Sequence, residues 1–157
     1  MMNVQYEKTK FDAFQTIEVD VKASMDNVFN LISTTEGIQQ WFPQLSFEEA
    51  DGELYVNFDM SDGTNEQSIV IQKEAPTHIT FTWAIGEVEF KLTDQGDVTH
   101  LYFHERMPFE FDHVAEDFTG WQLQIENLKS VAETGEQKAM EQSTFDRIYQ
   151  DVKKNLF

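Results

Sequence analysis

Length, composition and charge limit what this chain can be. Its 157 residues suit a single domain, which is large enough to bury a core without disulfides. Acidic residues outnumber basic ones by 29 to 11, giving a net charge of −18, and Cys is absent. A negative surface repels phosphate, which argues against nucleic acid and anionic membranes as partners. The lack of Cys excludes disulfides, thiolate catalysis and Cys-ligated metal sites.

The N-terminal segment carries no sign of export. Residues 1–10 are polar and mixed in charge, without the apolar stretch of a signal peptide. The sequence also lacks any run of about 18 apolar residues, the length that a membrane span requires. Together with the absence of Cys, these features lead us to expect a cytoplasmic protein.

The first two thirds of the chain change from strand to helix and back to strand. Alternating apolar residues over 15–21 predict a half-buried strand. Ser24 is a candidate N-cap for a following helix, and a short second helical turn ends at Pro43. From Leu45 to Pro108 the apolar period is two, with turn signals between the apolar runs. This pattern predicts an antiparallel sheet made of hairpins.

The clearest helical pattern follows the strands. Its apolar residues recur at steps of three and four, namely Phe111, Val114, Phe118, Trp121, Ile125, Leu128 and Ala132. A helix over about 112–133 would be roughly 30 Å long, and Gly135 would end it. Another apolar stripe with helical spacing occupies the tail, 137–157. We expect the tail helix to fold back onto its own domain; the alternative is a contact with a partner or a second copy.

The order of these elements predicts an α+β fold. A sheet with one apolar face must cover that face, and only the late helix is long enough to do so. We therefore expect a curved antiparallel sheet of about six to seven strands around the long C-terminal helix. Two short helices follow the first strand, and an extra helix closes the chain. The domain would comprise residues 12–134, with 135–157 as a helical extension packed on it.

Three stretches of the sequence resemble a known family. They are a first strand running into a helix that contains Val28-Phe29, a short helix ending in Trp41-Phe42, and a last helix that contains Gly120-Trp121. In this order they resemble the START-like (SRPBCC) superfamily, and within it the bacterial branch named after the activator of the heat-shock-protein-90 ATPase. The resemblance extends over about residues 14–133.

The resemblance implies a helix-grip fold with a cavity under the last helix. Across the superfamily such cavities take lipids, hormones, polyketides and other apolar molecules. Members include carriers, cyclases and co-chaperones, so the fold alone does not select an activity. The tail beyond residue 133 lies outside the resemblance.

Large aromatic side chains are expected on both layers of this fold. Rings from the sheet and the helix would hold the layers apart, leaving either an apolar pocket or a core filled by the rings themselves. The residues expected to line a pocket are Trp41, Phe42, Phe58, Trp83, Phe103, Glu105, Phe118, Trp121 and Ile125. Burial of one ring is worth roughly 2–3 kcal/mol, so a ligand that contacts several rings could reach micromolar affinity.

Glu105 is the one charged residue in this set. It follows Leu101 and Phe103 at steps of two along the predicted strand, so its side chain should lie on the same, covered face of the sheet. Desolvation there would raise its pKa and let it act as an acid, a base or a ligand anchor. The alternative, favoured because the strand is ending, places Glu105 at a wet rim or beside a basic group.

The histidines do not predict a metal site. His100 and His104 are four residues apart, and on a strand that spacing covers about 13 Å, too far for one ion. No acidic stretch has the spacing of a calcium loop. We therefore expect neither a metal nor another cofactor.

Catalytic motifs are otherwise missing from the sequence. It contains no Gly-rich phosphate loop and no Gly-x-Ser-x-Gly elbow, and it has only two arginines for an anion clamp. We expect a monomeric, non-enzymatic module that binds a small hydrophobic or aromatic ligand between the sheet and the long helix. The alternatives are a chaperone-associated module that binds a protein partner, as the family name suggests, or a small cyclase- or hydratase-type enzyme with polar groups in its cavity.

Overall fold

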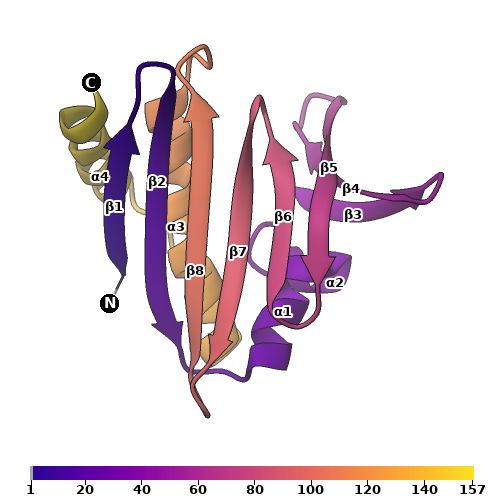
Figure 1. The fold of residues 1–157 in the computed structure, drawn as a ribbon. Helices are drawn as coiled ribbons and strands as arrows, with labels where there is room; N and C mark the ends of the chain where they lie inside the picture. The colour runs from indigo at the N-terminus through magenta and orange to yellow at the C-terminus, as the bar shows by residue number, and fades with distance from the viewer. Residues whose placement is uncertain (1) are drawn as a thin grey trace.

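The computed structural model describes residues 2–157, which form an antiparallel sheet with helices on one face (Figure 1). The elements are β1 (Asn3–Lys8), β2 (Asp12–Val21), α1 (Met25–Ser33), α2 (Thr35–Ile38), β3 (Leu45–Ala50), β4 (Glu53–Asp59), β5 (Asn65–Glu74), β6 (His78–Trp83), β7 (Gly86–Asp94), β8 (Thr99–Pro108), α3 (Val114–Thr134) and α4 (Gln142–Leu156). None of the described helices is both long enough and apolar enough to cross a bilayer.

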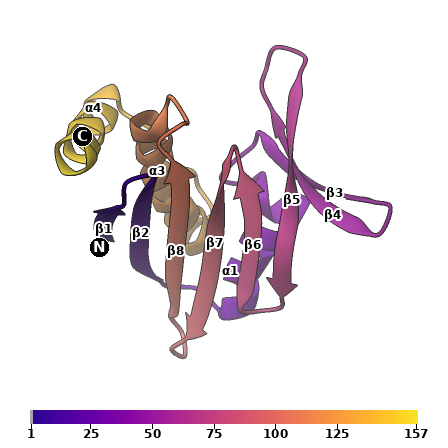
Figure 2. The ribbon, with the colours of Figure 1, turned by 45° about the horizontal axis from the view of Figure 1, so that its top comes forward.

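The eight described strands form one sheet in the order β1-β2-β8-β7-β6-β5-β4-β3. Strand β5 links the β3–β4 hairpin to the other strands, and its register with β6 shifts between Val70 and Gln72. Its first half pairs with β4 and its second half with β6. The β3–β4 hairpin therefore runs at an angle to the other strands (Figures 1 and 2), so that the sheet curves around the helices.

Local signals place α1 and α2 where the sequence predicts them. The Ser24 hydroxyl caps α1 by accepting a hydrogen bond from the backbone N–H of Asn27, 3.2 Å away. Helix α2 crosses close to α1 at Gly37, where a Cβ would overlap the carbonyl oxygen of Asn30. The short helix ends at Ile38, and Trp41 and Phe42 follow in the turn behind it.

The long helix α3 is buried on more than one side. Phe118, Trp121 and Ile125 are buried in the apolar core that it forms with the sheet, and α4 packs against α3 and against β1. Val152 and Leu156 of α4 are buried in the same core. Helix α3 ends at Gly135, whose left-handed backbone (φ 79°) lets its N–H donate to the carbonyl of Val131.

The predicted fold class is confirmed, with one strand more than expected. Strand β1 pairs with β2 along its whole length, from Asn3 opposite Glu18 to Lys8 opposite Ala13. Its sequence is mostly polar because it is an edge strand whose side chains are exposed or half-buried. Such a strand lacks the apolar alternation that reveals a half-buried strand in a sequence.

Candidate functional site

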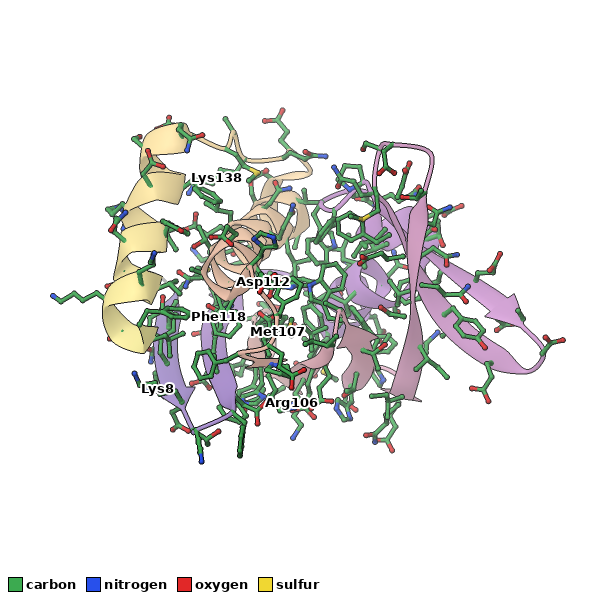
Figure 3. All side chains as sticks on the ribbon, turned by 90° about the horizontal axis from the view of Figure 1, so that it is seen from above. Lys8, Arg106, Met107, Asp112, Phe118 and Lys138 are labelled. Carbon is green, nitrogen blue, oxygen red and sulfur yellow. The ribbon has the colours of Figure 1, made fainter. Side chains whose placement is uncertain are left out.

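The space between α3 and the sheet is packed with aromatic rings over most of its length. Trp41, Phe90, Phe103 and Phe118 are buried almost completely. The ring of Phe103 lies 5.1 Å from that of Phe90, between centroids. In Figure 3, Phe118 of α3 and Met107 of β8 lie between helix and sheet, whereas Arg106 lies on the opposite face. The central part of the interior is therefore a filled core.

An apolar cleft of about 180 Å³ remains at one end of this core. Phe58 comes from β4, Trp83 from the end of β6, and Phe42 from the turn behind α2. The full lining comprises Phe42, Phe58, Trp83, Asp117, Gly120, Trp121, Gln124 and Met140. Ordinary ligand pockets measure roughly 300–1,000 Å³, so this cleft suits a molecule of one or two rings.

Other depressions of the surface are larger but more polar. One of about 310 Å³ lies between α3 and α4, with Glu126, Lys138, Glu141 and Arg147 among its walls. Apolar walls with a few converging polar groups distinguish a small-molecule site from a wet surface depression. The aromatic cleft is therefore the stronger candidate.

Four rings form a fixed wall of the cleft. Phe42 stands at its centre, with ring centroids 5.5 Å from Trp121, 5.8 Å from Phe58 and 6.0 Å from Trp83. The two indoles lie 5.0 Å apart, close to perpendicular. Edge-to-face contacts of this kind orient rings as well as bury them, so the wall is preformed.

Asn127 holds the chain segments on both sides of the cleft. Its amide Nδ2 donates to the carbonyl oxygen of Trp41 at 2.7 Å, beside Phe42. Its Oδ1 accepts from the backbone N–H of Lys138 at 2.8 Å, two residues before Met140. One buried side chain of α3 thereby sets the positions of both Phe42 and Met140.

Gly120 leaves room in the wall that α3 contributes. A Cβ built at this position meets nothing within 4 Å, and the residue lines the cleft. A larger residue at this turn of the helix would project into open space. The absence of a side chain at Gly120 therefore makes part of the cleft.

Unpartnered polar atoms gather at this cleft. Among the described residues, the buried side-chain atoms without a hydrogen-bond partner are Glu105 Oε2, Asp117 Oδ2, Trp121 Nε1 and Gln124 Oε1. Three of the four belong to residues that line the cleft. Glu105 and Asp117 hydrogen-bond with each other when one of them is protonated. Trp121 Nε1 and Gln124 Oε1 are therefore the two of these atoms that no neighbouring side chain satisfies, and each such group costs about 1–3 kcal/mol.

Asp117 in the lining of the cleft forms a pair of carboxyl groups with Glu105, which lies behind it. Glu105 is fully buried, and desolvation, followed by the charge of Asp117 and a hydrogen bond between the two groups, raises its pKa well above the ordinary value. Burial also raises the pKa of Asp117, while its hydrogen bonds with Glu105 and Trp83 oppose that shift. Because the two carboxyl groups are adjacent, ionisation of one disfavours ionisation of the other.

The carboxyl pair continues into a buried polar chain under α3. Gln15 donates through Nε2 to Glu105 Oε1 at 3.3 Å and to the carbonyl of Phe118 at 3.2 Å. Gln122 donates to Gln15 Oε1 at 3.0 Å and to the hydroxyl of Tyr6 at 2.6 Å. On its other side, the pair ends at Trp83, whose Nε1 donates to Asp117 Oδ1 at 2.8 Å.

The structure corrects the expected alternative for Glu105. Its side chain neither lies at a wet rim nor pairs with a basic group, because β8 continues to Pro108 and keeps the residue in the covered layer. Its hydrogen-bond partner is Gln15 of the neighbouring strand. The spacing of Glu105 from Leu101 and Phe103, in steps of two along the strand, predicted this orientation.

The sequence-predicted pocket residues divide into two groups. The structure brings Phe42, Phe58, Trp83 and Trp121 together at the cleft. It places Trp41, Phe103, Phe118 and Ile125 in the filled core, and Glu105 behind the cleft next to Asp117.

Four lining residues were not expected from the sequence. They are Asp117, Gly120, Gln124 and Met140. Asp117, Gly120 and Gln124 follow the helical steps of three and four around Trp121, so spacing along α3 could have found them. Met140 carries no such signal, because its segment has no regular structure and reaches the cleft through the contact of Lys138 with Asn127.

The histidines expected to lie apart on a strand do so. His100 lies between two carboxylates of β2, with Nδ1 2.8 Å from Asp20 and Nε2 3.0 Å from Glu18. These contacts raise the pKa of His100, chiefly through the hydrogen bond with Asp20. His104 stacks on Tyr102 instead.

One protein-family model matches most of the chain. The model, described as activator of Hsp90 ATPase homolog 1-like protein, matches residues 22–133. A conserved protein of unknown function from Enterococcus faecalis is similar in structure, with TM-score 0.87 and 25% identity over 98% of this chain and 92% of that chain. No curated protein matches the chain. The family predicted from the three sequence stretches is thereby confirmed.

Two further solved structures share the fold. CalU16 from Micromonospora echinospora is 20% identical with TM-score 0.69, over 96% of this chain and 91% of that chain. The Aha1 dimer from Colwellia psychrerythraea is 19% identical with TM-score 0.65, over 76% of this chain and 96% of that chain.

Proposed function

The chain belongs to the family described as activator of Hsp90 ATPase homolog 1-like protein, and from the cleft it carries we propose that it binds one small aromatic or hydrophobic molecule. The ligand lies at the end of the core between β4, β6 and α3. The observation that supports this proposal is the convergence on one cleft of four aromatic rings and two unpartnered polar atoms, Trp121 Nε1 and Gln124 Oε1.

The energetics of the cleft favour a modest, specific affinity. Burial of a single ring against this wall is worth roughly 2–3 kcal/mol. A hydrogen bond that satisfies a buried unpaired group adds about 1–3 kcal/mol, because it removes the penalty that the group otherwise bears. A two-ring ligand with one such contact therefore reaches affinities in the micromolar range.

Trp fluorescence tests this proposal directly, because Trp83 and Trp121 form the wall. We expect titration with naphthalene, naphthol and indole to quench or shift the emission of the protein in a saturable way. The variant Gly120→Leu fills the open position in the wall and should abolish the response. The matched control Gln150→Leu adds the same side chain to an exposed position of α4 and should keep it. A response that is absent with every probe, or equal in both variants, contradicts the proposal.

A second candidate function is binding to a chaperone. The description of the matching family favours it. In this case a pull-down with the bacterial homologue of the heat-shock-protein-90 chaperone retains the protein, and the chaperone's ATPase rate rises when the protein is added. The Gly120→Leu variant separates the two candidates, because filling the cleft blocks a small ligand and leaves a surface contact elsewhere intact.

A further inference from the structure

The charge of the cleft carries information about the head group of its ligand. Asp117 is the one charged residue in its lining, and no Lys, Arg or His of the described chain forms a salt bridge with it. Its Oδ1 accepts from Trp83 Nε1, and its other side-chain hydrogen bond is with the carboxyl group of Glu105. The lining thus contains a carboxyl group without a cation.

Glu105 does not neutralise this group. Glu105 provides no positive charge, and ionisation of one carboxyl group of the pair disfavours ionisation of the other. Gln15 and Trp83 contribute neutral donors on either side of the pair. A charge in so apolar an environment is costly unless an opposite charge accompanies it, and the described protein provides none.

The aromatic wall adds to this preference for a cation. Ring faces carry negative electrostatic potential and attract cations within about 6 Å, most strongly in Trp. Trp83 and Trp121 have ring centroids 5.0 Å apart, with Phe42 and Phe58 beside them. The net charge of −18 further attracts cations and repels anions over the whole surface.

From these observations, and resting on the proposed function above, we propose that the cleft recognises an aromatic amine in its protonated form. The ring lies against Trp83 and Trp121, and the ammonium group donates to the carboxylate of Asp117. Trp121 Nε1, a buried donor without a partner in the described protein, donates to an acceptor on the ligand's ring system. Gln124 Oε1 accepts from a second donor of the ligand, further along α3.

Three probes of the same ring size test the head group. Naphthylmethylamine, naphthylmethanol and naphthoate differ chiefly in charge, and their binding is measured by calorimetry at neutral pH. We expect the amine to bind about tenfold more tightly than the alcohol, because a charge-assisted hydrogen bond and the ring faces both favour the cation. Naphthoate should not bind, since its carboxylate would face Asp117.

The variant Asp117→Asn is the matched control. Asn keeps an acceptor for Trp83 and can donate to Glu105, so the cleft retains its shape, which is checked by an unchanged affinity for the alcohol. In this variant the amine and the alcohol should bind with about equal affinity. The inference is overturned if the amine binds the native protein no better than the alcohol does, or if the preference for the amine survives in Asp117→Asn. In either case, binding of the alcohol still supports the proposed function. Failure of all three probes overturns both.

Discussion

Replacing Glu105 by Gln tests how the buried carboxyl pair affects stability. Gln has nearly the same shape, can accept the hydrogen bond from Gln15 Nε2, and can donate permanently to Asp117. It therefore satisfies the same contacts without needing a proton from solvent. The variant isolates the cost of keeping an ionisable group at this position.

The sign and size of the effect follow from the raised pKa. Between the ordinary Glu pKa near 4.5 and the raised value in the folded protein, the native state binds a proton that the unfolded chain has released. The free energy of unfolding of the native protein therefore falls as pH rises through this range, by at most about 1.4 kcal/mol per pH unit for one proton. Below this range the stabilisation from Glu105 is fully present.

Urea denaturation of both proteins at pH values from 5 to 8 measures the effect. We expect the native protein to lose stability relative to Glu105→Gln as pH rises, so that the variant is the more stable of the two at the upper end. The exposed carboxylate Glu49 gives a control, since Glu49→Gln should follow the native curve. Parallel curves for the native protein and Glu105→Gln would refute the raised pKa of Glu105.

Three further predictions concern the helices and the outer face of the sheet. Gly120→Ala should raise the free energy of unfolding by about 1 kcal/mol in urea, because a helix interior favours Ala and the position has room. His100→Gln should lower the free energy of unfolding by at most about 1 kcal/mol at pH 6, and the difference should vanish in thermal melts at high pH. The reason is that protonated His100 stabilises the fold at pH values below the ordinary His pKa, and this stabilisation is lost as the pH rises through the raised pKa of the folded protein. Leu156→Ala should cost about 2–4 kcal/mol, since Leu156 is buried, whereas Lys154→Ala at an exposed site of α4 should leave the urea midpoint unchanged.

Local sequence signals predicted the helices well because their causes are local. Ser24 caps α1 with its own hydroxyl, and Gly135 ends α3 through its own backbone. The apolar steps along α3 predicted the residues that meet the sheet, including Phe118 and Ile125. Strand β1 was missed because its pairing with β2 supplies the stability that its side chains do not show.

The candidate site was predictable only in its aromatic part. Ring residues on neighbouring strands and on one helix face must meet, so Phe58, Trp83 and Trp121 could be grouped from their positions. Which rings fill the core and which border a cleft depends on the volume left after packing. That balance placed Phe103 inside and left the cleft beside Phe42.

The sequence by itself determined the order of elements, the sheet with a covered face and the long helix that covers it, because these follow from side-chain periodicity along the chain. The contact between Glu105 and Asp117, and the position of Met140 at the cleft, became visible in the folded molecule alone. Both outcomes depend on distances between segments far apart in sequence. Such distances are set by how all the side chains pack together, which periodicity does not encode.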